Sequence, residues 1–213
     1  MKTENLKCLA FPSGPLETNT YLVHSEAGDA AIVDPVELNS ALFTKINELK
    51  LIVRALLITH THVDHIYSIS EYASKFNVPV YMHSAAEKMR DFYTESCEML
   101  GFGSNTMPKE YFACDRLETI QFGQSKLSVI TSPGHSPCGI MYMADDFIIT
   151  GDTLFKGSIG RYDLHLASLP LLYQSLKKLA PFQDDVKIYP GHGPSTTLGY
   201  ERKTNHFLQA CKG

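Results

Sequence analysis

Imidazole and carboxylate side chains are crowded into one short stretch that follows an apolar run. Residues 55–58 form a continuous apolar segment that predicts a buried strand, and the hexapeptide HTHVDH begins at His60 directly after it. Residues two apart share a face of an extended segment, so His60, His62 and Asp64 can converge, while His65 begins the next helix. The chain must therefore fold so that a strand ends where several polar side chains meet.

Three further apolar runs end in glycine followed by the same kinds of residue. These endings are Pro133-Gly134-His135, Thr150-Gly151-Asp152 and Pro190-Gly191-His192. Glycine lets the backbone turn tightly, and open α/β sheets collect their ligands at strand ends. A histidine at one strand end is often only structural, but the whole set indicates a shared metal site, with room for two ions.

Short apolar runs alternate with segments of helical period along the whole chain, and no low-complexity linker or repeat interrupts them. This pattern predicts an α/β fold, and we expect one domain that spans residues 1–213. The expected helices cover residues 37–50, 66–76 and 169–179, and the expected strands cover residues 55–58, 78–82, 127–130, 147–150 and 186–189.

Composition excludes several functional classes. The chain has 213 residues, of which 44% are hydrophobic, and carries a net charge of −4, so disorder and nucleic-acid binding are poor expectations. No apolar stretch reaches about 18 residues, so we expect no contact with a membrane. The five cysteines include no CxxC pair, and the N-terminus lacks the apolar run of a signal peptide. We therefore expect reduced thiols and a cytoplasmic location.

The segment from Met89 to Phe112 has no clear period, because aromatic residues and methionines alternate with glycines and charges. Two interpretations remain open. The segment either forms a small additional core under a long loop or provides an adaptable apolar flap beside a pocket.

The order of the candidate ligands resembles that of the metallo-β-lactamase superfamily and, more narrowly, of the glyoxalase II-like hydrolases. The resemblance extends from Asn19-Thr20-Tyr21 and Asp34-Pro35 to the stretch between Thr196 and Arg202, nearly the whole chain. It implies a four-layer αββα sandwich of two mixed β-sheets flanked by helices, with a dinuclear metal centre at one edge. Few residues follow His192, so we expect the helical C-terminal domain of full-length glyoxalase II to be absent.

The resemblance also implies a division of the ligands between two divalent ions. His60, His62 and His135 would hold the first ion, Asp64, His65 and His192 would hold the second, and Asp152 would bridge them. We expect Asp64 and Asp152 to act in catalysis as well. Imidazole ligands favour zinc, while the bridging carboxylate leaves iron or manganese open.

Such a centre predicts a metallo-hydrolase. Water held between two cations ionises near a pKa of about 7, and the bridging hydroxide can attack a carbonyl carbon. No general acid stands out beside the ligands, which favours a thiolate leaving group because a thiol has a pKa of about 8.5. The expected substrate is a small S-acyl thioester of the glutathione type, cleaved as by hydroxyacylglutathione hydrolase.

Other functions of the same fold remain as alternatives. The main one is an oxidoreductase that resembles persulfide dioxygenase and holds one iron on His60, His135 and Asp152. Hydrolysis of a lactam is less favoured because the leaving nitrogen needs a proton. An RNA-cleaving role is disfavoured because the chain lacks a basic surface for nucleic acid.

Arg161 is the candidate substrate-binding residue. The stretch from Gly151 to Arg161 is similar to the part of glyoxalase II that meets the glutathione carboxylate through a basic residue, and a guanidinium binds a carboxylate through two hydrogen bonds. An ion pair with Asp163 is an equal alternative. Asp163 also stands where glyoxalase II has a glutathione-contacting tyrosine, so recognition of glutathione stays open.

Asp34 and Cys138 are two further residues near the expected site. Asp34 is interpreted either as a buried acid that orients a ligand histidine or as a simple turn residue. Cys138 is interpreted as a small buried hydrophobic residue rather than a ligand.

Overall fold

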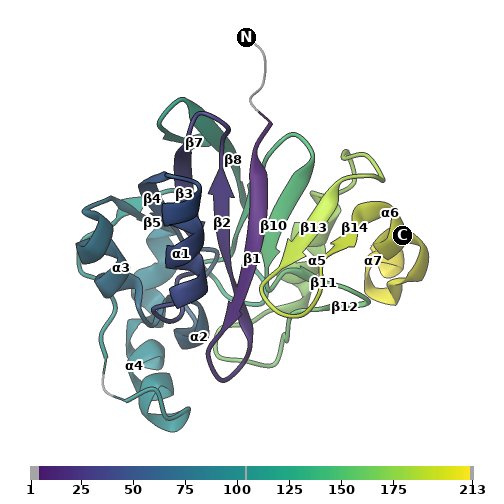
Figure 1. The fold of residues 1–213 in the computed structure, drawn as a ribbon. Helices are drawn as coiled ribbons and strands as arrows, with labels where there is room; N and C mark the ends of the chain where they lie inside the picture. The colour runs from purple at the N-terminus through teal and green to yellow at the C-terminus, as the bar shows by residue number, and fades with distance from the viewer. Residues whose placement is uncertain (1–4, 104, 212–213) are drawn as a thin grey trace.

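A computed structural model describes residues 5–103 and 105–211 and contains two six-stranded sheets that face each other (Figure 1). The first sheet has the strand order β1-β2-β3-β4-β5-β6, in which β1 to β3 are antiparallel and β3 to β6 are parallel. Its strands are β1 (Lys7–Ser13), β2 (Thr18–His24), β3 (Asp29–Val33), β4 (Ile52–Leu57), β5 (Val80–Met82) and β6 (Phe112–Ala113).

The second sheet has the order β14-β13-β10-β9-β8-β7, and only β10 and β13 run parallel. Its strands are β7 (Thr119–Phe122), β8 (Ser125–Thr131), β9 (Ile140–Met143), β10 (Phe147–Gly151), β13 (Lys187–Pro190) and β14 (Thr196–Thr197). A small separate hairpin joins β11 (Leu154–Phe155) to β12 (Ser158–Ile159).

Helices cover the outer face of each sheet, which completes four layers (Figure 1). The first sheet is covered by α1 (Ser40–Glu48), α2 (Val63–Ile66), α3 (Ile69–Phe76), the 3₁₀ helix η1 (Ser84–Met89) and α4 (Arg90–Met99). The second sheet is covered by α5 (Leu169–Lys177), α6 (Leu198–Thr204) and α7 (His206–Ala210). The expected αββα sandwich of two mixed sheets is confirmed.

The inner strands β3, β4 and β10 are largely apolar on both faces because the middle of each sheet is buried on both sides. Tyr21 and Val33 point into the core between the sheets, whereas their neighbours Leu22 and Ile32 point outward to the helices. Successive side chains of a strand alternate between faces, so a sheet covered on both sides reads as an unbroken apolar run. This physical reason made the five expected strands visible in the sequence.

The expected elements are confirmed, but most of their bounds shift by a few residues; for example, the helix expected over residues 169–179 ends at Lys177. The helix expected over residues 37–50 begins at Ser40, because the Asn39 side chain accepts a hydrogen bond from Leu42 N and caps it. The helix expected over residues 66–76 is divided into α2 and α3, and Asn77 in the left-handed conformation ends α3. Strands β2, which contains several polar residues, and β9, which is short, were not predicted.

The segment from Met89 to Phe112 forms α4, a loop and the start of β6; Ser104 lies outside the described residues. Met89 and Met107 are buried, and Tyr93 and Met107 belong to the same core cluster as the outer face of the first sheet, so the segment extends that core instead of forming a separate one.

Two other expectations concern membrane contact and the state of the cysteines. In residues 5–103 and 105–211, no helix combines the length and the apolar character that a membrane span requires. All five cysteines are free. Residues 1–4, on which the expectation about the N-terminus partly rests, lie outside the described part.

The four-layer arrangement predicts the effect of mutations on both faces of β10. Ile148 packs under the helices and Ile149 packs between the sheets, and both are 0% exposed. We expect Ile148→Ala and Ile149→Ala each to lower the free energy of unfolding by about 2–5 kcal/mol, measured by urea denaturation. Gln121→Ala is the control, because Gln121 is exposed on β7, and we expect it to change the free energy of unfolding by no more than about 0.5 kcal/mol. A neutral result for either isoleucine would show that one face of β10 is open to solvent.

Candidate metal centre

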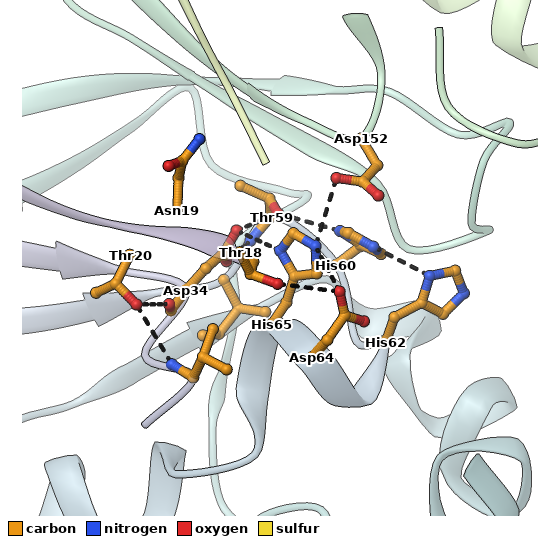
Figure 2. A network of polar contacts seen from close by, with 12 residues as sticks. Thr18, Asn19, Thr20, Asp34, Thr59, His60, His62, Asp64, His65 and Asp152 are labelled. Carbon is orange, nitrogen blue, oxygen red and sulfur yellow. Dashed lines mark hydrogen bonds and ion pairs between the residues drawn. The ribbon is translucent and has the colours of Figure 1, made fainter. Parts of the chain in front are cut away.

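All seven predicted ligands lie at one edge of the sandwich, where strands of both sheets end. His60, His62, Asp64 and His65 follow β4 and extend into α2, while His135 follows β8. Asp152 follows β10 and His192 follows β13. Side chains separated by up to 132 positions thus share one site, which Figure 2 shows in part.

The first group consists of three imidazoles. His60 Nε2 lies 3.1 Å from His62 Nδ1, and His135 Nε2 lies 2.9 Å from the same nitrogen. All three residues are buried. Nitrogens bound at about 2.0–2.1 Å to one tetrahedral zinc ion lie about 3.3 Å apart, so the observed spacing is close to that of a ligand set.

The second group joins a carboxylate to two imidazoles. Asp64 Oδ2 lies 3.2 Å from His192 Nε2 and 3.6 Å from His65 Nε2. Thr18 Oγ1 donates a hydrogen bond of 3.1 Å to the same oxygen. Carboxylate oxygen and imidazole nitrogen together suit a divalent transition metal or zinc.

Asp152 faces both groups. Its Oδ1 lies 3.4 Å from His65 Nε2, and its Oδ2 lies 3.4 Å from His135 Nε2 and 3.6 Å from His192 Nε2. Asp152 therefore lies between the two groups, since Oδ2 is near a histidine of each and Oδ1 is near His65 of the second.

Hydrogen bonds to the opposite ring nitrogens fix the protonation of the histidines. His65 Nδ1 donates to Asp34 Oδ2 (2.9 Å), His135 Nδ1 donates to the Arg161 carbonyl (2.8 Å) and His192 Nδ1 donates to the Leu16 carbonyl (3.0 Å). In the neutral form of each ring the lone pair is therefore on Nε2, the nitrogen that faces the cluster and can bind a metal ion. Such outer partners are typical of metal-bound histidines.

His60 is held by a relay through Thr59. Thr59 Oγ1 donates to Asp34 Oδ2 (2.6 Å), so it accepts from His60 Nδ1, 3.1 Å away. Asp34 thereby orients two ligand histidines, and it also accepts a hydrogen bond from Thr59 N. The interpretation of Asp34 as a buried acid that orients a ligand is confirmed. Figure 2 shows Asp34 on one side of His65 and Asp64 on the other.

The polar atoms inside the cluster are better satisfied by a bound cation than by hydrogen bonds to one another. His60 Nε2 and His135 Nε2 both present lone pairs to His62 Nδ1, which carries at most one proton and can satisfy only one of them. His65 Nε2 and Asp152 Oδ1 are buried and have no hydrogen-bond partner. Buried polar atoms are normally satisfied, so these convergent acceptors indicate a bound metal ion.

The electrostatics of the site point the same way. Burial lowers the pKa of His60 well below its usual value and lowers that of His62 to about 3, so both imidazoles are neutral ligands at pH 7. Burial also opposes a charge on His65, but the carboxylates of Asp152, Asp64 and Asp34 overcome it and raise the pKa of His65 well above its usual value. The carboxylates therefore favour positive charge at this position.

Two glycines give the ligands the space they need. A Cβ atom on Gly191 would collide with Asp152 Oδ1 and approach His65 Cε1 to 2.7 Å, and one on Gly160 would collide with the Asp152 carbonyl. Gly191 was recognised in the sequence as part of a strand ending, whereas the role of Gly160 was visible only in the structure.

Arg161 contributes its backbone rather than its side chain to the cluster. Its guanidinium is 67% exposed and makes two hydrogen bonds of 3.0 Å with the Asp163 carboxylate, the ion pair that the sequence left open. Cys138 is buried, as expected, and its Sγ contacts Thr61 Oγ1 and Ser136 Oγ at 3.2 and 3.1 Å.

An aromatic contact beside the cluster was missed in the sequence. The Phe92 ring of α4 lies 5.9 Å from the His62 ring, and the exposed His165 ring stacks on it with centroids 5.0 Å apart. The flap interpretation of the segment from Met89 to Phe112 therefore has support at Phe92. Neither contact follows from local sequence, because the two residues come from distant elements.

Comparisons with known proteins agree with this geometry. A family model described as the metallo-beta-lactamase superfamily matches residues 13–192. A hydroxyacylglutathione hydrolase, GloC, of Haemophilus influenzae is 30% identical over 206 residues, which cover 94% of this chain and 97% of the relative.

Two solved structures are similar over nearly their whole length. The B3 metallo-beta-lactamase BLEG-1 superposes with a TM-score of 0.85 and 32% identity, covering 95% of this chain and 99% of that one. TTHA1623 in a di-iron-bound form gives a TM-score of 0.83 and 32% identity, covering 93% of this chain and 99% of that one.

The outer partner Asp34 provides a test of the metal site. We expect Asp34→Asn to weaken metal binding by about 10–100-fold, because His65 and the Thr59 relay lose their acceptor. The measurement is competition with a chromogenic chelator, supported by elemental analysis. Asp115→Asn is the matched control, since Asp115 likewise accepts from one backbone amide and one hydroxyl, those of Ser84, but has no partner among the ligands. Equal metal affinity in both variants would contradict a role for Asp34.

Proposed function

Because this chain belongs to the metallo-beta-lactamase superfamily, whose members bind divalent metals and are mostly hydrolases, we propose that it is a dinuclear metallo-hydrolase that cleaves thioesters. The observation that carries the proposal is the position of Asp152. Its Oδ2 faces His135 of the first group and His192 of the second, and its Oδ1 faces His65 of the second, so the two ligand groups meet at one carboxylate.

We propose for the ligand groups the roles that the family resemblance implies. His60, His62 and His135 would hold one ion, Asp64, His65 and His192 the other, and Asp152 would be shared. Ions held there would lower the pKa of water and stabilise negative charge on the attacked carbonyl oxygen. Zinc is the proposed metal, since imidazole nitrogen dominates the donor set, although a relative of similar size is known in a di-iron form.

The protein side chains orient the reactants. Asp34, Thr59 and the carbonyls of Leu16 and Arg161 fix the imidazole rings, so little reorganisation is needed during the reaction. Asp64 and Asp152 have catalytic roles, because their carboxylates face the place where the metal ions and the substrate would bind. Thr18 donates a hydrogen bond to Asp64 Oδ2, so the protein itself fixes the position of this oxygen before a substrate binds.

A thioester suits this site because its leaving group needs no proton donor. A thiolate with a pKa of about 8.5 departs unprotonated, whereas the nitrogen of an amide or lactam must be protonated. The similarity to the hydroxyacylglutathione hydrolase of Haemophilus influenzae supports an S-acyl thioester as substrate. The similarity to BLEG-1 makes a lactam the competing substrate to be tested.

We expect the zinc-loaded protein to release free thiol from S-lactoylglutathione, measured with a thiol reagent, and to bind about two ions per chain by elemental analysis. His60→Ala should lower kcat/KM by at least about 100-fold, because one ligand and its charge stabilisation are lost. His83→Ala, which removes a histidine that caps η1, should have little effect on the activity.

Other outcomes of the same experiment would contradict the proposal. Hydrolysis of a lactam without thioester cleavage would identify a lactamase. A single bound iron, together with oxygen uptake in the presence of glutathione persulfide, would identify the dioxygenase-like alternative.

Arg161 is proposed to bind an acidic group of the substrate, in exchange with its partner Asp163. Arg161→Ala should raise KM for an acidic thioester, because the substrate loses an ionic partner. The increase should be only roughly two- to fivefold, because exposed ion pairs contribute little. Asp163→Ala should lower KM, since it frees the guanidinium. Steady-state kinetics at low and high salt measure both effects. Unchanged KM in both variants would leave Arg161 with its ion pair alone.

A further inference from the structure

The chain between Asp152 and Arg161 leaves the metal centre and returns to it. Asp152 contributes the shared carboxylate at one end, and the Arg161 carbonyl accepts the His135 hydrogen bond at the other. Between them, β11 and β12 pair through only two residues each. A hairpin this short has little stability of its own, and contacts with other elements must therefore hold it in place.

The C-terminal helices supply that support through a buried carboxyl group. Glu201 of α6 is 0% exposed, and its Oε2 accepts hydrogen bonds from Gly157 N (2.8 Å) at the turn of the hairpin and from Asn205 Nδ2 (2.9 Å). Its Oε1 accepts from Thr196 Oγ1 (2.7 Å). Asn205 Nδ2 also donates to the Ser158 carbonyl (3.0 Å). Glu201 and Asn205 therefore bind the hairpin by hydrogen bonds at two successive residues, Gly157 and Ser158.

Apolar packing adds to this attachment. Leu154 and Ile159, one from each hairpin strand, are buried in the same cluster as Leu198 of α6 and Leu208 of α7. The backbone at Gly160 passes so close to Asp152 and His135 that an added Cβ would collide with the Asp152 carbonyl and lie 3.0 Å from His135 Cβ, so a shift of the hairpin would move both residues.

We propose that Glu201 is a positioning residue for the metal centre, which acts through the hairpin on Asp152 and, by way of the Arg161 carbonyl, on His135. The stretch between Thr196 and Arg202, which the sequence singled out without a role, thereby acquires one. The inference rests on the proposed function, because it assumes that these ligands bind metal.

The test compares three variants in the full chain, with zinc affinity measured by chelator competition and ligand geometry by the visible spectrum of the cobalt-loaded protein. Glu201→Ala removes the acceptor, and we expect zinc affinity to fall by about 10–100-fold with a changed cobalt spectrum. Glu201→Gln should stay close to wild type, because its amide oxygen can accept from Gly157 and Asn205 while its amide nitrogen donates to Thr196 Oγ1.

Leu42→Ala is the control for a general loss of stability. Leu42 is 0% exposed on α1, under the other sheet, and has no contact with the hairpin cluster. All proteins are compared at the same interval below their own Tm. A purely structural role for Glu201 predicts equal zinc affinity in Glu201→Ala and Leu42→Ala, and that result would overturn the proposal.

Two further results separate the possible failures. Thr196→Val frees only one oxygen of Glu201, so it serves if Glu201→Ala does not fold, and its zinc affinity should fall below that of Leu42→Ala; an unchanged affinity would overturn the inference. Absence of zinc binding by the wild type would instead contradict the proposed function.

Discussion

His65 lies fully buried among three carboxylates, and the rest of the site depends on this arrangement. Asp34 comes from the end of β3, Asp64 from α2 and Asp152 from the second sheet, so their contacts with one imidazole join the two sheets at their shared edge. Burying so many acidic groups is costly unless positive charge is close. The fold brings these carboxylates and His65 together with four further imidazole ligand candidates, an arrangement that could hold metal ions.

The supporting contacts are distributed over elements that are distant in sequence. The β1–β2 turn holds His192 through the Leu16 carbonyl, β3 holds His65 and His60 through Asp34, and the β11–β12 hairpin holds His135. Each ring is thus fixed from behind while its metal-binding nitrogen faces the centre. The four layers serve this purpose, because two sheets covered on both sides give rigid strand ends from which to build.

Much of the fold and of the ligand set could be predicted because the signals are local. The strand before His60 is a continuous apolar run, a consequence of burial on both faces, and the spacing of His60 and His62 places both on one side of an extended segment. The expectation that Asp64 lies on that extended segment and His65 begins the helix was wrong, because α2 already begins at Val63 and Asp64 faces His65 and His192. The glycines before His135, Asp152 and His192 mark sharp turns at strand ends. Some strands escaped prediction at the edges and also inside the sheets, such as β2 and β9, and so did the short helices, because their stability depends on neighbours as well as on their own sequence.

The sequence by itself determined which atoms could bind a metal and in which order they occur. Only the tertiary structure decided how those atoms are held: that Asp34 orients a ligand instead of closing a turn, that Arg161 pairs with Asp163 and lends its carbonyl to His135, and that Phe92 meets His62. The physical reason is that residue type and spacing act along the chain, whereas a hydrogen bond between distant residues exists only after packing has fixed the distance between them.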